Sequence, residues 1–299
     1  MKASLTLNWF KGRKARALIT RIIVLLLLVD IAYIFVMPIL RLISTSLMNI
    51  MDLYDPTVVW LPRRVAIENY TQALTALAYP QAFLNTLYIS GACAILQTLS
   101  CALVGYGFAR FKFPGRDRLF YLVLFAMIVP PHAIIIQLFV MVSGMHWLES
   151  YYPFLVPSAF GMGLRGALFV FIYRQFFKGL PWELEDAAMI DGASPLRVFY
   201  NIMLPLARPA ILVVFLFSFV WHWNDNLEPS IYLSRDELFF LPQRLSVVEA
   251  ALSNMRLRAM WGTGTIMAAT LLVILPLLLL YIFTQRYFIE SIERTGLID

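Results

Sequence analysis

The chain has 299 residues, of which 61% are hydrophobic and 14% are charged, and its formal net charge is +6. An ordinary soluble domain carries about 25% charged residues, so this composition excludes that class of protein. The sequence predicts instead an all-α integral membrane protein, because a chain in lipid must satisfy its backbone hydrogen bonds within helices.

Several apolar stretches are long enough to cross the hydrocarbon core of a bilayer, which takes about 20 helical residues. We expect six transmembrane helices, in chain order at roughly 19–41, 83–109, 118–142, 153–177, 208–232 and 262–287. The first stretch is too long for the core of a signal peptide, and no small-residue cleavage site follows it. We therefore interpret it as a membrane helix like the other five.

The basic residues indicate how these helices are oriented. Most of the 24 Lys and Arg residues share one side of the membrane if the N-terminus is cytoplasmic, and positive charge accumulates on that side. The sequence thus predicts that both termini are cytoplasmic, with a basic N-terminus at 1–17, a transmembrane domain at 18–289 and a tail at 290–299. The net charge then reflects topology and contact with the lipid bilayer, and we expect no nucleic-acid partner.

No pattern of catalytic or metal-ligating residues is found along the chain. Cys93 and Cys101 fall within the second predicted helix, where they are expected to be buried small side chains. His132, His146 and His222 are scattered, and no glycine-rich phosphate loop is present. We therefore expect no catalytic residues, no metal site and no bound cofactor, and the chain is not expected to be an enzyme by itself.

The loop at 181–207, between the fourth and fifth predicted helices, differs in composition from its apolar surroundings. Acidic residues at its start suit the N-terminus of a short helix, where the helix dipole favours negative charge. Gly192 can end this helix in a left-handed conformation. Ser194 and Pro195 then suit the cap and first position of a second helix, which Leu204 and Pro205 are expected to end.

The two predicted helices would form a compact knob on the cytoplasmic side. Leu184, Ala187, Ala188 and Asp191 fall on neighbouring positions of the first helix, so its expected contact face is small. A passive loop has no need of such a construction. The alternative is an amphipathic hairpin that lies on the lipid, which would carry Lys or Arg rather than acids on its polar face.

The loop resembles the signature loop of permease subunits of bacterial binding-protein-dependent ABC importers. That pattern reads Glu-Ala-Ala, three residues, Gly, nine residues, Ile-x-Leu-Pro, and here it is met by Asp186-Ala187-Ala188, Gly192 and Ile202-Met203-Leu204-Pro205. The one departure is Asp186, which stands where the pattern has Glu. Further stretches are similar to the maltose-type carbohydrate-uptake branch, in particular its shorter permease: FLNTLYIS from Phe83, VGYGFARFKFPGRD from Val104, WNDNLEPSIYL from Trp223 and TQRYF from Thr284.

This resemblance covers roughly residues 18–289 and implies a type I ABC importer permease fold, with a coupling helix in the loop between helices 4 and 5. It implies a second permease subunit in a heterodimer, two ATPase subunits that bind ATP and Mg, and an extracytoplasmic solute-binding protein, all at a bacterial inner (plasma) membrane. The expected function is translocation of a sugar or oligosaccharide. The alternatives are another solute, such as an amino acid, a peptide or a phosphate ester, or an ion-coupled secondary transporter, which should show inverted repeats.

Three groups of candidate site residues follow from the resemblance and the local chemistry. Coupling to the ATPase is assigned to Glu185, Asp186, Ala187, Ala188, Asp191, Gly192, Ile202, Leu204 and Pro205. The candidate substrate pathway comprises Asn85, Pro130, Gln137, Trp221, Trp223, Asn224 and Asp225, although the tryptophans also suit an interfacial aromatic belt and Pro130 a packing kink. Candidate docking residues for the binding protein are Arg235, Arg244, Arg256 and Arg258.

Overall fold

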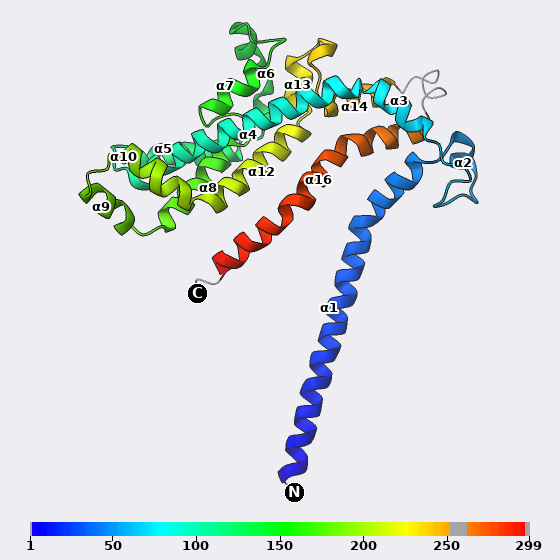
Figure 1. Ribbon diagram of the computed structural model, residues 1–299, viewed down its shortest axis with the longest axis horizontal. Coiled ribbons are helices and arrows are strands. Elements are labelled where there is room, and N and C mark those ends of the chain that lie inside the picture. The colour runs from blue at the N-terminus through cyan, green and yellow to red at the C-terminus, as the bar shows by residue number, and fades with distance from the viewer. Residues whose placement is uncertain (1, 252–261, 297–299) are drawn as a thin grey trace. The chain divides into compact units, whose positions relative to one another are not determined.

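The computed structural model describes residues 2–251 and 262–296, and within these ranges every regular element is a helix (Figure 1). The chain divides into two compact units. One comprises the residues up to Ala73 together with the segment that ends at Leu271, and the other comprises 74–251 and the residues from Leu272 onward. Each unit is described by itself.

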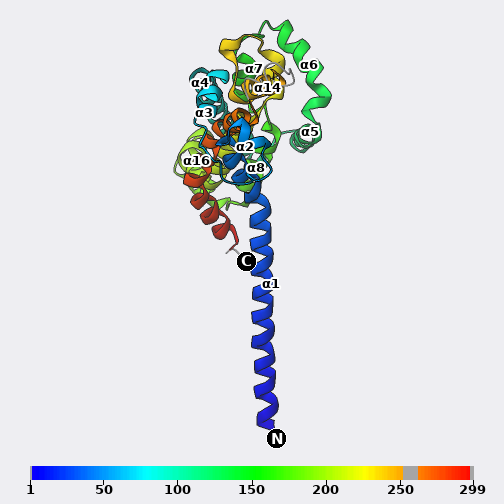
Figure 2. The same ribbon diagram turned by 90° about the vertical axis from the view of Figure 1, so that its right-hand side faces the viewer.

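The first unit contains the longest helix, α1 (Lys2–Ser46), which Figure 2 shows as a single unbroken rod. Its apolar side chains between Leu18 and Leu40 are exposed, as expected for a helix that faces lipid or another chain. The unit also holds α2 (Ile50–Tyr54), the first turns of α3 (Glu68–Ala76) and the start of α16 (Thr263–Gly296).

Hydrogen bonds from polar side chains join these elements where α1 ends. Asn69 Nδ2 donates to the carbonyls of Ser46 and Met48, each at 2.9 Å. Thr265 Oγ1 donates to Gln72 Oε1 at 2.9 Å, which connects α16 to α3. Buried polar groups of this kind must be paired, and here the pairing fixes the chain at the end of the first helix.

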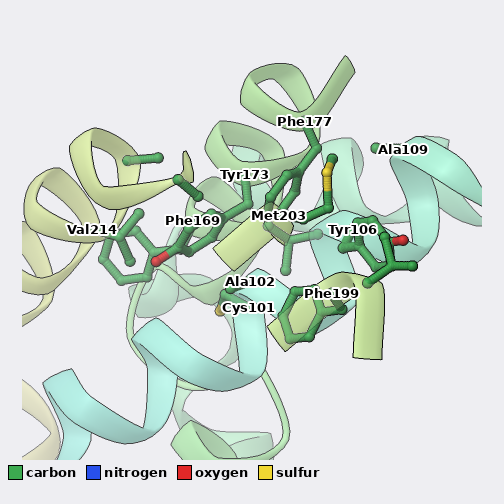
Figure 3. Packing of buried hydrophobic residues seen from close by; sticks show 14 of the residues in the cluster. Cys101, Ala102, Tyr106, Ala109, Phe169, Tyr173, Phe177, Phe199, Met203 and Val214 are labelled. Carbon is green, nitrogen blue, oxygen red and sulfur yellow. The ribbon is translucent and has the colours of Figure 1, made fainter. Parts of the chain in front are cut away.

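The second unit is organised around α4 (Tyr79–Arg110), which lies lengthwise beside α8 (Gly166–Gly179) and α12 (Arg208–Asn224) and also packs against α7 (Tyr152–Ala159) (Figure 1). Gly105 allows the close approach of α4 and α8, because a Cβ at this position would lie 2.5 Å from Tyr173 Cβ. The aromatic cluster of Tyr106, Phe177 and Phe199 fills one end of the interface (Figure 3).

A second cluster closes the other end of α4 and includes Ile89, Cys93, Phe154 and Phe240. Cys93 and Cys101 are both buried free thiols, as the sequence predicts. The chain beyond α12 folds over this end as α13 (Leu227–Tyr232), the 3₁₀ turn η2 (Asp236–Leu238) and α14 (Leu241–Ala251).

Three of the predicted transmembrane helices are continuous in the described residues, at Ala17–Ser46, Tyr79–Arg110 and Thr263–Arg286. The predicted helix at 118–142 is a bent pair of helices, α5 (Arg116–Ile128) and α6 (Pro131–Gly144), which meet at 104°. Pro130 adopts an extended conformation at the break, since the residue before a proline is disfavoured in a helix. The third predicted helix is thus interrupted at Pro130 and Pro131, as the two prolines in the sequence indicate.

The sequence predicts a continuous helix at 153–177 and another at 208–232, and both predictions are wrong. Between α7 and α8 the chain is non-helical, and Gly161 and Gly163 have φ angles of 71° and 81°. The fifth helix ends at Asn224, where Asp225 turns extended and its carboxylate accepts the N–H of Leu227 at 3.0 Å. By length and apolarity the described helices supply three membrane spans, or up to five if each bent pair is one span.

Candidate functional site

The acid-edged loop at 181–207, called the coupling segment after the role expected of it from the sequence, contains α9 (Glu183–Ile190) as its first helix. Gly192 follows with a φ angle of 82°, the left-handed conformation predicted from the sequence. Ser194 caps α10 (Pro195–Val198), as predicted, and its side chain accepts the N–H of Arg197.

The second half of the segment does not end where the sequence indicates. After α10 the backbone forms a π-helical turn, η1 (Phe199–Met203), and then the short α11 (Leu204–Leu206). The axis then bends by 79° into α12. Leu204 and Pro205 therefore lie within this helical stretch, and Ala207 ends it. Single π-turns of this kind are found frequently at functional sites.

The coupling segment has an inner and an outer face. Glu185 and Ala188, three residues apart on α9, are buried, as are Phe199 and Met203 further along. Asp186, Ala187 and Asp191 are exposed, together with Gly192 and Pro205, whereas Ile202 and Leu204 are half-buried. The small face predicted from Leu184, Ala187, Ala188 and Asp191 is thus divided between the two faces.

Glu185 does not take the position expected of a group that meets another chain. Its side chain is 3% exposed, and its Oε1 lies 2.8 Å from Nε of Arg110, the last residue of α4. Tyr106 donates its hydroxyl to Oε2 of the same carboxylate at 3.4 Å. Burial raises the pKa of the Glu185 carboxyl above its ordinary value, and the Arg110 guanidinium opposes that shift.

The outer face carries large apolar side chains that the sequence reasoning missed. Ile190 is 85% exposed and Leu196 60%, and Tyr200 and Met189 are also exposed. They lie on either side of Gly192 along the chain. Exposed large apolar side chains on an otherwise polar loop are typical of a contact surface. The signal was present in the sequence as Met189-Ile190 and Leu196 on either side of the glycine.

Three residues of the predicted pathway form hydrogen bonds within the fold. Asn85 Nδ2 donates to the carbonyls of Glu237 and Phe239 at 2.7 and 3.2 Å, so it holds the loop before α14. Trp223 is buried, and its indole N–H donates to the carbonyl of Val273 on α16 at 3.2 Å. Asp225 caps α13.

The remaining predicted pathway residues are more accessible. Asn224 is exposed, although its amide donates to the carbonyl of Val220 at 2.9 Å. Pro130 and Gln137 are exposed on the bent third helix, and Trp221 is half-buried. Of the tryptophan pair, only Trp221 could therefore present an aromatic face to a bound molecule.

The non-helical stretch 160–165 lies next to Trp221 and was not identified from the sequence. Gln97 Nε2 donates to the carbonyls of Met162 and Leu164 at 2.8 and 3.1 Å, and Ser218 Oγ donates to Gln97 Oε1 at 2.6 Å. This network satisfies backbone carbonyls that have no helical partner.

Arg165 is the last residue of this stretch and is exposed, with an unusual φ angle of 60°. Its guanidinium carbon lies 5.6 Å from the centre of the Trp221 ring, within the range of a cation–π contact. The Trp221 ring is also stacked against the rings of Phe169 and Phe217, each at a centroid distance of 5.5 Å. Arg165 and Trp221 together form a polar and aromatic surface, called the ledge.

Two of the arginines predicted to dock the binding protein form ion pairs or hydrogen bonds within the chain. Arg235 pairs with Glu149 at 3.5 Å and also donates to its carbonyl at 2.8 Å. Although burial raises the pKa of Glu149, the N–H groups of Arg235 and Ser234 lower it below its ordinary value overall. Arg244 donates to the Asp236 carbonyl at 2.7 Å. Arg256 and Arg258 lie outside the described residues.

Comparison with known proteins gives consistent matches. Residues 102–294 match the family model described as "Binding-protein-dependent transport system inner membrane component". The arabinooligosaccharides transport system permease protein AraQ of Halalkalibacterium halodurans is 30% identical over 269 residues, which cover 89% of this chain and 92% of that protein. The diacetylchitobiose uptake system permease protein NgcG of Streptomyces coelicolor is 32% identical over 234 residues, covering 78% of this chain and 75% of that protein.

A solved structure shares the fold. A chain from the crystal structure of a bacterial ABC transporter involved in the import of the acidic polysaccharide alginate superposes with a TM-score of 0.79. The match covers 90% of this chain and 96% of that chain at 21% sequence identity. At this identity the likeness concerns the arrangement of the helices.

Proposed function

The chain belongs to the family of binding-protein-dependent transport system inner membrane components, and from this we propose that it is one permease subunit of an ATP-driven importer of a sugar or oligosaccharide. Its all-helical fold is that of an ABC importer permease. Relatives named for arabinooligosaccharide and diacetylchitobiose transport support the carbohydrate assignment.

The construction of the coupling segment is the observation that carries this proposal. Its inner face packs into the aromatic cluster at the end of α4 and α8, so the segment is joined firmly to the helix bundle. Its outer face exposes Ile190, Leu196 and Tyr200 beside the acid Asp186. We propose that this outer face docks into a groove on an ATPase subunit, which binds ATP and Mg and performs the hydrolysis.

The proposal includes six membrane spans and cytoplasmic termini. α5 and α6 would together form the third span, α7 and α8 the fourth, with 160–165 as its internal break, and α12 alone the fifth. Non-helical backbone at membrane depth is tolerated where it lines a cavity or is buried in protein. With this topology the coupling segment lies in the cytoplasm of a bacterium, where the ATPases are.

We propose that the substrate passes along the ledge of Arg165 and Trp221. An exposed cation within a span is costly in lipid, so Arg165 must face water or another subunit. A half-buried indole and a guanidinium offer a sugar an aromatic face and several hydrogen-bond donors. Gln97 and Ser218 support the ledge through the 160–165 backbone.

The second permease subunit would pair with this chain across its exposed apolar surfaces, α1 among them. The end formed by α13, η2 and α14 would face the extracytoplasmic binding protein. Arg235 and Arg244 would then shape that surface through Glu149 and Asp236 rather than reach outward as free charges.

Reconstitution in proteoliposomes tests this function. The chain would be co-expressed with its partner permease, the ATPase and the binding protein, and the probe would be a labelled arabinooligosaccharide or diacetylchitobiose presented with the binding protein. Uptake that requires ATP on the ATPase side and the binding protein on the other side is the expected result. Uptake driven by an ion gradient without ATP would overturn the proposal in favour of a secondary transporter.

A further inference from the structure

A buried ion pair joins the coupling segment to the end of α4. The Arg110 side chain is 1% exposed, and its Nη2 donates to the carbonyl of Leu180 at 2.7 Å. The guanidinium carbon lies 4.3 Å from the centre of the Trp182 ring, and Nε lies 2.8 Å from Oε1 of Glu185. One side chain of α4 therefore contacts the entry to the coupling segment and the first turn of α9.

These contacts bridge a break in the backbone. α8 ends at Gly179 and α9 begins at Glu183, and the residues between them are not helical. A helix transmits a displacement along its axis, but an irregular link bends. The coupling helix α9 is thus fixed through the side chain of Arg110 to α4, in addition to its covalent connection to α8.

The end of α4 is itself held firmly by its neighbours. Gly105 lets α4 approach α8 so closely that the backbone N of Arg174 lies 3.0 Å from the position of an added Cβ. Tyr106, one turn before Arg110, packs edge-on against Phe177 of α8 at 5.5 Å and donates its hydroxyl to Glu185. Movement of Arg110 must therefore move the packed pair α4 and α8.

A role in stability alone does not explain this arrangement. The 2.8 Å contact between Nε and Oε1 is too bent to be a hydrogen bond, and Arg110 Nη1 has no acceptor among the described residues. Removing two charges from water costs free energy, and well-packed apolar residues often replace such pairs at no loss of stability. What the pair supplies is a fixed contact between α4 and α9, since either charge alone is poorly tolerated when buried.

We propose that Arg110 and Glu185 are positioning residues that lock the coupling helix to α4, so that displacement of the coupling segment by the ATPase moves the spans. This inference rests on the proposed function. It assigns Glu185 to the permease interior, not to the ATPase contact for which the sequence alone made it a candidate.

The test compares uptake per ATP hydrolysed in the reconstituted importer. Arg110→Gln and Glu185→Gln each leave one charge unpaired, and uptake per ATP is expected to fall by about tenfold while the ATPase still co-purifies. Arg110→Lys keeps the charge and should retain more coupling than Arg110→Gln. The exchange Arg110→Glu with Glu185→Arg should recover part of the loss. Glu68→Gln is the matched control, because Glu68 forms an exposed ion pair with Arg64 at 3.7 Å.

The outcomes separate the link from the function on which it rests. Single variants that transport as efficiently per ATP as the wild type would refute the link, with the importer function intact. Loss of the ATPase from a folded Glu185→Gln complex would also refute it, because Glu185 would then be an ATPase contact. If the wild-type complex itself shows no ATP-dependent uptake, the proposed function fails, and the link as a coupling device fails with it.

Discussion

Replacement of Gly192 by Val tests whether the bend in the coupling segment matters for transport. Gly192 has a φ angle of 82°, and an added Cβ would meet no atom within 4 Å. The penalty is therefore conformational and not steric. A residue with a Cβ costs about 1–2 kcal/mol in the left-handed region, and a β-branched one is the least suited to it.

That penalty is small against the stability of a folded domain, about 5–15 kcal/mol, so the variant should fold and insert. Its local effect is larger. The N–H groups of Gly192 and Ala193 donate to the carbonyls of Met189 and Ala188, each at 3.0 Å, and these bonds set the angle between α9 and α10. A strain of about 1.4 kcal/mol changes the population ratio of the bent conformer about tenfold. We expect uptake to fall by a comparable factor.

The assay is ATP-dependent uptake in proteoliposomes at equal protein level, with Gly115→Val as the matched control. Gly115 has a φ angle of 79° and equally open surroundings, but it precedes α5 and lies outside the coupling segment. The control suffers the same backbone strain and should keep most of its uptake. Equal loss in both variants would mean that strain in general impairs the protein, and normal uptake by Gly192→Val would refute the role of the bend.

Three further predictions concern the ATPase contact, the topology and the substrate pathway. Asp186→Lys should abolish co-purification of the ATPase because it reverses an exposed charge on the outer face, whereas a full complex with this variant would leave docking to the apolar residues alone. A cysteine at position 194 should react with a membrane-impermeant maleimide only from the cytoplasmic side and one at position 64 only from outside, and labelling of position 194 in sealed cells would contradict the topology. Trp223→Ala should cost about 3–5 kcal/mol and lower the folded yield, because Trp223 is buried. Trp221→Ala should leave the yield unchanged and raise the sugar concentration needed for half-maximal uptake, and an unchanged concentration dependence would remove Trp221 from the pathway.

The long helices and the local turns of the coupling segment could be predicted because their signals are local. α1 and α4 follow from uninterrupted apolar runs, and Gly192 and Ser194 are read from a few neighbouring residues. The break at 160–165 was missed although Gly161 and Gly163 stand there, because apolarity outweighed the glycines in the interpretation. A pair of glycines within an apolar run should be interpreted as a turn signal.

Partners that are distant in the sequence could not be predicted in this way. Asn85 and Trp223 resemble pathway residues in a list of side chains, yet each satisfies a carbonyl on a remote segment, at Glu237 and Val273. Their polar atoms form hydrogen bonds within the fold, and the sequence does not reveal these partners. Arg110 was counted only as one of the positive charges that indicate topology, and its contact with Glu185 depends on how α4 and α9 meet.

The two faces of the coupling segment explain why its acids cannot be treated as a group. Glu185 and Asp186 are adjacent, but one is buried against Arg110 and the other is exposed beside Ala187. A change on the inner face alters what the spans do when the segment moves, whereas a change on the outer face alters whether the ATPase binds at all. Uptake per ATP hydrolysed and co-purification of the ATPase measure these two effects separately. Because neighbouring positions on a helix point in different directions, a signature motif that spans both faces combines a docking surface with a mechanical link.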